Sequence, residues 1–234
     1  MAETADKAWR SSDTEGATYA AVAMARLLHG AVGPIRSVVD VGCGVGVFLN
    51  AFAEAGAERI QGYDAEWVDT ARLRIPREAF RAVDLSLPLE DAGRYDLAIC
   101  LEVAEHLPQG RADSLVRDLT RLAPLVLFSA AIPGQGGDGH IHERWPSYWR
   151  GLFESQGFIA HDPIRTAFWD DARMPYWYRQ NTLLYAAEAL DMPRPDAMTD
   201  LVHPEQYLGV HYQDTTPRAY LAGKLARLLD RRKG

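Results

Sequence analysis

The stretch Val38–Phe48 reads VVDVGCGVGVF, a short apolar run that breaks into three alternate glycines before an apolar pattern resumes. Glycine has no Cβ, so the backbone can turn sharply at these positions and come close to a ligand. A glycine-rich turn between a strand and a helix is typical of nucleotide-binding α/β proteins. We therefore expect a strand over residues 36–41, a helix over 46–56 and a nucleotide-like ligand at the turn between them.

The spacing of these glycines separates two kinds of cofactor. A dinucleotide fingerprint requires glycine at its first, third and sixth positions, and the sixth position here is Val47. The acid Asp40 lies two residues before the first glycine, where it would repel a pyrophosphate but could meet a cationic group. The motif therefore argues against a nicotinamide-dependent dehydrogenase.

Strand-like and helix-like patterns alternate over residues 36–132, which predicts a parallel sheet with helices on both faces. An alanine-rich helix is expected before the first strand, over residues 16–30. The other elements that the patterns predict are strands over 59–64, 79–84, 95–101, 125–131, 158–165 and 180–187, and helices over 66–74, 111–122, 145–156 and 217–232.

Three further signals follow the glycine motif, each about one strand–helix unit apart. Asp64 closes RIQGYD, Asp84 lies within AVDL, and Glu102–His106 (EVAEH) follows the fourth strand. With Asp40, they resemble the motifs of class I S-adenosylmethionine (SAM)-dependent methyltransferases. The resemblance implies SAM as cofactor and S-adenosylhomocysteine (SAH) as product. It also implies an α/β, Rossmann-like, doubly wound sheet of seven mostly parallel strands in the order 3-2-1-4-5-7-6, the last strand antiparallel, with helices on both faces.

The same resemblance implies roles for the acids at the strand ends. Asp40 would hold the methionine ammonium of SAM, Asp64 the ribose hydroxyls and Asp84 the adenine amino group, while Glu102 would face the methionine part. The cofactor-binding residues expected on this basis are Asp40, Gly42, Cys43, Gly44, Gly46, Asp64, Ala65, Asp84, Leu85, Leu101 and Glu102.

Three histidines are the candidate catalytic residues. His106 follows the fourth strand, and His140 and His142 lie in a glycine-rich segment after the fifth, so all three are expected on the acceptor side of the cofactor. Histidine suits proton transfer because its unperturbed pKa is about 6.5. Capping or packing of the loops is the alternative role. Alternate histidines in an extended segment share one face, so a divalent metal on Asp138, His140, His142 and Glu143 is a further alternative. With no other ligand set evident, no metal is expected.

Ten aromatic residues lie between Trp145 and Tyr178, partly in a segment between the last two strands that also carries charges and a proline. Rings with polar tips on a loop suit an amphipathic small molecule, although packing in the core explains such rings equally well. The candidate substrate-binding residues are Trp145, Tyr148, Trp149, Trp169 and Tyr178. The strings HIHERWPSYW, WYRQNTLLY and LVHPEQY are similar to a bacterial subgroup of small-molecule methyltransferases associated with glycan or natural-product pathways.

The composition of the chain limits the cellular location and the binding partners that can be expected. The 234 residues carry a net charge of −7, which disfavours a nucleic-acid partner, and two cysteines do not make a disulfide framework. The chain lacks a long apolar run or a signal-like start, so a cytoplasmic protein without a membrane partner is expected, as a monomer or homodimer. We expect an N-terminal helical segment (1–35), a SAM-binding core (36–188) and a C-terminal extension (189–234), which would cap the pocket, mediate dimerisation or pack as a surface tail.

Together these observations predict a SAM-dependent methyltransferase of a small-molecule acceptor. A hydroxyl or carboxyl oxygen of a natural product or sugar is the expected site of methylation, because histidines crowd the expected acceptor side. Two alternatives remain open: a small-molecule N-methyltransferase, and a non-catalytic interaction protein that keeps the fold.

Overall fold

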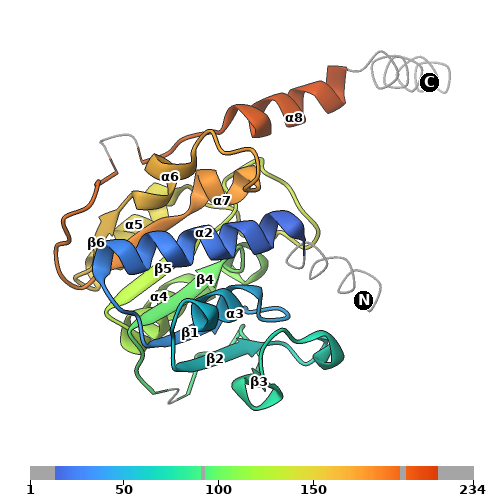
Figure 1. Ribbon diagram of the computed structural model, residues 1–234. Helices are drawn as coiled ribbons and strands as arrows, with labels where there is room; N and C mark the ends of the chain where they lie inside the picture. Colours follow the sequence, from blue (N-terminus) through green and yellow to red (C-terminus); the bar gives the residue numbers. More distant parts are fainter. Residues whose placement is uncertain (1–13, 91–92, 196–198, 216–234) are drawn as a thin grey trace. The chain divides into compact units, whose positions relative to one another are not determined.

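The computed structural model describes residues 14–90, 93–195 and 199–215 (Figure 1). The chain divides into two compact units, Met1–Leu201 and Val202–Gly234. The strands are β1 (Ser37–Val41), β2 (Arg59–Asp64), β3 (Phe80–Ala82), β4 (Leu97–Leu101), β5 (Leu125–Ser129), β6 (Ile159–His161) and β7 (Leu183–Ala186). The α-helices are α2 (Glu15–Val32), α3 (Val47–Glu54), α4 (Ala112–Leu122), α5 (Pro146–Ser155), α6 (Pro163–Phe168), α7 (Tyr176–Asn181) and α8 (Pro204–Thr215). Short 3₁₀ helices are η2 (Thr70–Arg72), η3 (Arg77–Ala79), η4 (Ala104–His106) and η5 (Gln109–Arg111).

The strands of the first unit form one seven-stranded sheet in the order β3-β2-β1-β4-β5-β7-β6. Neighbouring strands pair in parallel except where β7 pairs with β5 and with β6. The expected fold class is therefore confirmed. The sheet order reverses direction at β1, so the space beyond the carboxyl ends of β1 and β4 is where an open α/β sheet binds its ligand.

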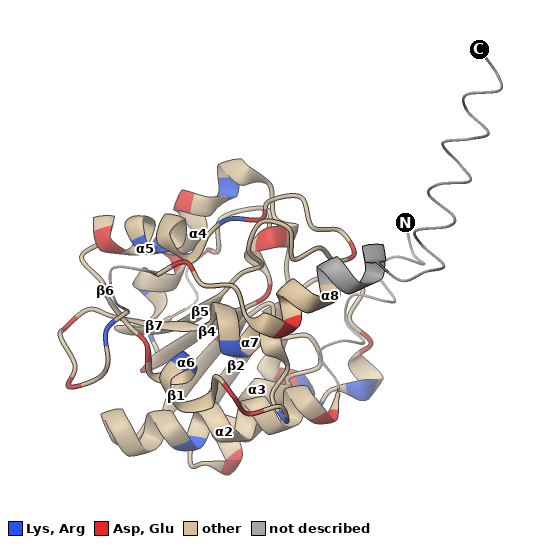
Figure 2. Ribbon diagram, turned by 90° about the horizontal axis from the view of Figure 1, so that it is seen from above, with Lys and Arg blue, Asp and Glu red and all other residues tan. Residues whose placement is uncertain are grey.

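Successive residues of the central strands face opposite helix layers. In β4, Leu97 and Ile99 belong to an apolar cluster that includes residues of α2 and α3. Ala98 and Cys100 belong to a second cluster, which includes residues of α4 and α5. Figure 2 shows α2 and α3 on one side of the sheet and α4 and α5 on the other. Because both faces are covered, β4 is apolar throughout instead of alternating with polar residues.

The three glycines after β1 adopt backbone conformations that other residues avoid. Gly42, Gly44 and Gly46 have φ angles of 89°, 53° and 85°. A Cβ on Gly42 would lie 2.2 Å from Cγ2 of Val103, and one on Gly46 would lie 2.8 Å from Cγ1 of Ile75. The glycine pattern is therefore required by the left-handed turn and by packing at two of its positions, in addition to any approach of a ligand.

The helix expected over residues 66–74 is wrong. Only η2 forms there, and its first turn is closed by the Asp69 carboxylate, which accepts a hydrogen bond from the Ala71 N–H at 3.1 Å. The Arg74 N–H donates to the Val45 carbonyl at 2.8 Å, which ties the segment to the glycine turn. Trp67 is 64% exposed. A helix here would gain little from burying a face, and the tertiary hydrogen bonds decide the conformation.

The expected strand over 158–165 is only half correct. β6 ends at His161, and α6 begins at Pro163, because proline lacks the N–H that a strand pairing needs and its fixed φ suits the first turn of a helix. The segment between the last two strands contains α7 in addition to loop. The other expected elements agree with the structure apart from small shifts at their ends, except that the helix over 217–232 lies outside the described residues.

Residues beyond β7 remain attached to the first unit up to Leu201. The Asp162 N–H donates to the Pro193 carbonyl at 2.7 Å, and the Ser147 N–H donates to the Asp200 carboxylate at 2.8 Å. The expected boundaries at residues 35 and 188 stay predictions. In the second unit, α8 begins beside His203, whose Nδ1 accepts a hydrogen bond from the Glu205 N–H at 3.2 Å. Among the described helices, none has the length and apolar character needed to cross a membrane.

A pair of glycine substitutions tests whether the turn after β1 depends on backbone conformation. Gly46→Ala should lower the free energy of unfolding by about 2 kcal/mol, because alanine is strained at this φ and its Cβ meets Ile75. The control, Gly30→Ala, places a methyl group in open space within α2 and should raise stability by about 0.5–1 kcal/mol. Urea denaturation measures both. Equal effects of the two substitutions would contradict the conclusion that the turn after β1 requires glycine at position 46.

Candidate functional site

A cavity of about 1010 Å³ lies where β1, β2, β3, β4 and β5 end. Eleven of the residues expected from the sequence line it: Gly42, Gly44, Asp64, Ala65, Asp84, Leu85, Leu101, Glu102, His106, His140 and Tyr178. The structure therefore brings most of the expected cofactor side and part of the expected acceptor side to one place. Asp40, Cys43 and Gly46 do not line this cavity. Asp40 is buried, and burial together with the nearby Asp64 carboxylate raises its pKa.

Asp64, the last residue of β2, holds the glycine turn. Its carboxylate accepts hydrogen bonds from the Gly44 N–H at 2.6 Å and from the Ala65 N–H at 2.7 Å, one on each oxygen. Burial raises the pKa of Asp64, and these two hydrogen bonds oppose that shift. Each carboxylate oxygen still has a lone pair to offer, so the side chain can also accept hydrogen bonds from a ligand in the cavity.

Asp84 occupies the open rim of the same cavity, after β3. Its Oδ1 accepts a hydrogen bond from the Ser86 N–H at 2.9 Å, and hydrogen bonds from the side chain and backbone of Ser86 lower its pKa. Trp67, which lines the cavity nearby, is largely exposed. Sequence reasoning did not single out Trp67. Its position in a segment that was expected to be helical concealed that it lines the same cavity as Asp84.

Glu102 stands in an unusual backbone conformation at the end of β4. It has a φ of 54°, and its N–H donates to the carbonyl and the hydroxyl of Ser129, both at 3.1 Å. The carboxylate accepts hydrogen bonds from Gln135 Nε2 at 3.0 Å and from Asn181 Nδ2 at 3.1 Å. Burial raises the pKa of Glu102, and the bonds from Asn181, Ser129 and Gln135 act against this. Strained residues of this kind are concentrated at functional sites.

Gln135 and Asn181 are site residues that the sequence did not reveal. They come from the loop after β5 and from α7, and they also bond to each other, Asn181 Nδ2 donating to Gln135 Oε1 at 3.0 Å. Asn181 lies in the string WYRQNTLLY, which the sequence analysis used only for the resemblance, and Gln135 belongs to no quoted motif. Their separation along the chain hides their contact. The one feature of the sequence that could have indicated Asn181 is a group of polar residues directly before the apolar residues of β7.

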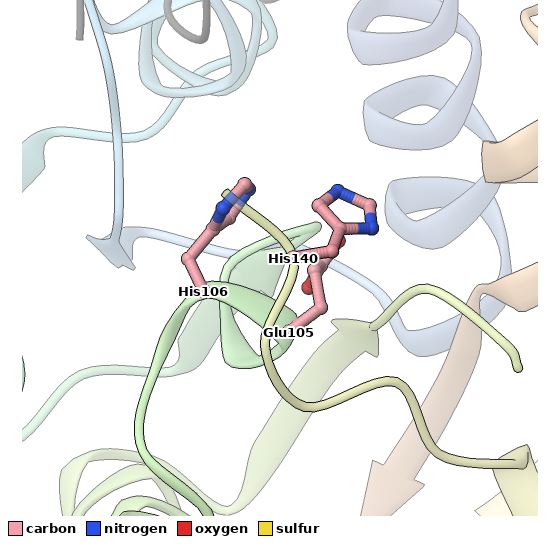
Figure 3. A group of neighbouring side chains, drawn as sticks. All are labelled: Glu105, His106 and His140. Atoms are coloured by element: carbon pink, nitrogen blue, oxygen red, sulfur yellow. The ribbon is translucent and has the colours of Figure 1, made fainter. Parts of the chain in front are cut away.

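His106 and His140 meet in the lining of the same cavity. Their rings are 4.8 Å apart between centroids and nearly perpendicular (Figure 3). His106 Nδ1 lies 3.3 Å from the Gly139 carbonyl, and His140 Nδ1 lies 3.1 Å from Oε1 of Glu143. Burial and the neighbouring His140 lower the pKa of His106. Two of the three histidines expected to be catalytic are therefore together and accessible to a ligand.

His142 is placed differently from its expected position. It is buried against Tyr148 and Trp149, with ring centroids 6.0 Å and 5.6 Å away, and it does not line the cavity. The segment is not an extended strand with both histidines on one face. It turns at Gly139, where φ is 76°, and then the N–H groups of Ile141 and His142 both donate to the Glu105 carbonyl. The alternative metal group built on His140 and His142 is therefore not assembled.

Only one of the five expected substrate residues, Tyr178, lines the cavity. It comes from α7 together with Tyr176 and Trp177, which the sequence analysis did not assign to the substrate. The four others lie elsewhere. Trp149 is a core residue whose ring packs 5.1 Å from that of Phe128, and Tyr148 packs on Trp149. Trp145 and Trp169 are partly buried outside the cavity lining.

The polar network around Glu102 can be tested by removing one amide. Asn181→Ala should lower the free energy of unfolding by about 1–2 kcal/mol, because the half-buried Glu102 carboxylate loses a hydrogen-bond donor. Asn50 provides the matched control, since its amide donates to the Glu54 carboxylate at 2.9 Å on the surface. Asn50→Ala should change stability by no more than about 0.5 kcal/mol. Chemical denaturation measures the free energy of unfolding of both variants. Similar losses of stability would show that the hydrogen bonds around Glu102 do not stabilise the fold more than a surface hydrogen bond does.

Comparison with known proteins gives the site its context. A family model described as "Methyltransferase domain" matches residues 15–166. The ubiquinone biosynthesis O-methyltransferase of Bordetella avium is 39% identical over 89 residues, which are 35% of this chain and 36% of that protein. The chloroplastic magnesium protoporphyrin IX methyltransferase of Arabidopsis thaliana is 30% identical over 92 residues, 37% of this chain and 30% of that protein. The matched segments thus span about a third of these curated relatives.

Solved structures share the fold over more of the chain. Magnesium protoporphyrin IX methyltransferase from Synechocystis PCC 6803 with bound SAM has a TM-score of 0.54 and 22% identity, over 78% of this chain and 85% of that one. Streptomyces venezuelae DesVI has a TM-score of 0.55 and 12% identity, over 73% and 92%. At such low identity these structures support the fold alone. The family match covers more than half of the chain and includes the glycine turn, so this chain belongs to the methyltransferase domain family.

Proposed function

We propose that this protein is a SAM-dependent methyltransferase that transfers a methyl group to an oxygen atom of a small-molecule acceptor. One observation carries the proposal: a single cavity is lined by the glycine turn and the acids after β2 and β3, and also by two histidines and the rings of α7. Its volume of about 1010 Å³ is at the upper end for small-molecule sites, which gives room for a cofactor and an acceptor together.

The residues at the strand ends fit SAM. Gly42 and Gly44 line the cavity without side chains, so the backbone is open to the methionine part of the cofactor. Asp64 would accept the ribose hydroxyls while it holds the Gly44 N–H, and Asp84, exposed on the rim, would accept from the adenine amino group. The ammonium group would meet Glu102, which lines the cavity, whereas Asp40 is buried outside the lining.

The histidines and the rings of α7 in the cavity lining fit an acceptor with a hydroxyl or carboxyl group. SAM supplies an activated methyl group, so the protein must mainly align the acceptor, and alignment alone can contribute about 7–11 kcal/mol. A hydroxyl must also lose its proton, and His106 and His140 are the side chains placed to orient it and favour that loss. The rings of Tyr176, Trp177 and Tyr178 suit an amphipathic molecule, such as a sugar or an aromatic natural product. The oxygen acceptors named for the ubiquinone relatives agree with this choice.

The cofactor assignment is tested by calorimetric titration with SAH. The wild-type protein should bind SAH, and Asp64→Asn should weaken binding roughly 10- to 100-fold, because hydrogen bonds to a charged group contribute about 1.5–3 kcal/mol. Asp69→Asn is the matched control. Its carboxylate only closes the first turn of η2, so SAH affinity should not change. If wild-type protein fails to bind SAH, the proposed function is wrong; unchanged affinity in Asp64→Asn removes that residue from the ribose role.

The acceptor assignment is tested with isotope-labelled SAM and a panel of phenols, sugars, carboxylates and amines. We expect labelled O-methyl products and no N-methyl products. At saturating SAM, His106→Ala and His140→Ala should each lower turnover of the best acceptor by at least roughly tenfold, since assisted proton transfer typically contributes 10²–10⁴-fold. Product analysis by mass spectrometry and NMR identifies the methylated atom. A panel in which only amines react would replace the oxygen assignment by N-methylation.

A further inference from the structure

Three side chains in the part of the cavity proposed to hold the acceptor form a group that the transfer of a methyl group does not by itself require. Glu105 and His106 belong to η4, just after β4, and His140 comes from the loop after β5 (Figure 3). One potential ligand atom from each lies within 4.8 Å of those of the other two. All three residues line the cavity described above.

Both imidazoles are oriented through the same ring nitrogen. His106 Nδ1 faces the Gly139 carbonyl at 3.3 Å, and His140 Nδ1 faces the Glu143 carboxylate at 3.1 Å. These acceptors favour the proton on Nδ1 and leave Nε2 of each ring with a free lone pair. Metal-binding histidines are held in this way, with the second nitrogen donating to a carboxylate or a backbone carbonyl.

Glu143 is itself fixed in place. Its two carboxylate oxygens accept hydrogen bonds from the N–H groups of Gly134 and Gly136, both at 2.8 Å. The glycine-rich loop therefore wraps around the carboxylate that orients His140. A loop that only had to connect β5 with α5 would not need this arrangement.

Glu105 provides the independent observation. The residue is 0% exposed, and its carboxyl group contacts the backbone of Ala131 and the side chain of Glu102. Two carboxylates in contact, one of them fully buried, are costly to keep ionised, and proteins normally pair such groups with a cation or with hydrogen-bond donors. Here the two carboxylates lie next to two imidazoles that can offer only lone pairs once their Nδ1 atoms are protonated.

From these contacts we propose that Glu105, His106 and His140 bind a divalent transition-metal cation in the acceptor half of the cavity. Two imidazole nitrogens and one carboxylate oxygen suit Mn²⁺, Fe²⁺, Co²⁺ or Zn²⁺ better than Ca²⁺, which prefers a cage of oxygens. Three protein ligands also leave positions open on the cation. An oxygen of the acceptor would occupy one of them; this last step rests on the proposed function, whereas metal binding does not.

The test is titration of tag-free, chelator-treated and dialysed protein with Co²⁺, followed by calorimetry and by the visible absorption of bound Co²⁺. We expect one equivalent to bind. Glu105→Gln, which keeps the shape of the side chain, and His140→Ala should each weaken binding at least 100-fold. Glu143→Gln should weaken it roughly 10- to 100-fold, as expected for a residue that orients a ligand without touching the metal.

Glu66→Gln is the matched control, because Glu66 lines the same cavity but lies outside the group of three. Its Co²⁺ affinity should equal that of the wild type. Circular dichroism and thermal melting establish that each variant is folded, and His106→Ala replaces any variant that is not. Absence of stoichiometric Co²⁺, Mn²⁺ and Zn²⁺ binding by the wild type, or equal affinity in all folded variants, would overturn the proposal. A parallel SAH titration separates this result from the proposed function, since either ligand can bind while the other fails.

Discussion

The hydrogen bonds between the end of β2 and the glycine turn after β1 are the constraint on which the rest of the site depends. The Tyr63 carbonyl accepts from the Gly42 N–H at 2.7 Å, and the Asp64 carboxylate accepts from the Gly44 N–H at 2.6 Å. These bonds hold a backbone with three positive φ angles in one place. With the turn fixed, α3 begins at Val47, and the space above the carboxyl ends of β1 and β2 stays open for a ligand.

A second constraint joins parts of the chain that are distant in sequence. Glu102 at the end of β4 is bonded to Gln135 after β5 and to Asn181 at the end of α7. The left-handed conformation of Glu102 directs the chain into η4, which carries Glu105 and His106 to the cavity. The proposed acceptor side therefore depends on tertiary contacts, while the proposed cofactor side depends mainly on neighbouring strands. This difference matters for what a sequence can reveal.

The place of Asp64 and Asp84 in the cavity could be predicted because these residues lie at fixed places relative to strand ends. Asp64 and Asp84 each follow an apolar run, and parallel strands bring their carboxyl ends to one edge, so the order along the chain gives the position in space. The resemblance to a known family then supplied the sheet order. Prediction failed where local pattern competes with tertiary bonds. Residues 66–74 have a helical pattern but are held by Arg74 against Val45, and Pro163 turns the second half of an expected strand into α6.

The histidines and rings proposed to contact the acceptor were harder to predict, because the sequence does not reveal which side of a helix or loop an aromatic ring faces. Trp149 and Tyr178 are both aromatic and both buried, yet Trp149 packs on Phe128 beneath the sheet surface while Tyr178 lines the cavity. His140 and His142 are separated by one residue, and the turn at Gly139 sends only the first of them to the cavity. Such choices follow from backbone dihedral angles and from contacts across the fold, which a pattern of residue types does not encode.

The division between the proposed cofactor side and the proposed acceptor side also bears on how this chain differs from other members of its family. The family model ends at residue 166, whereas α7, which contributes three aromatic residues to the cavity and Asn181 to the Glu102 network, begins at residue 176. A shared cofactor requires the same strand ends in every member, but different acceptors require different walls. A proposed acceptor side that is partly built from residues beyond the matched segment can vary from member to member, within the limit that Tyr178 of α7 also contacts Phe48 of α3, with ring centroids 5.5 Å apart. That arrangement allows one fold to keep its cofactor chemistry while the acceptor varies.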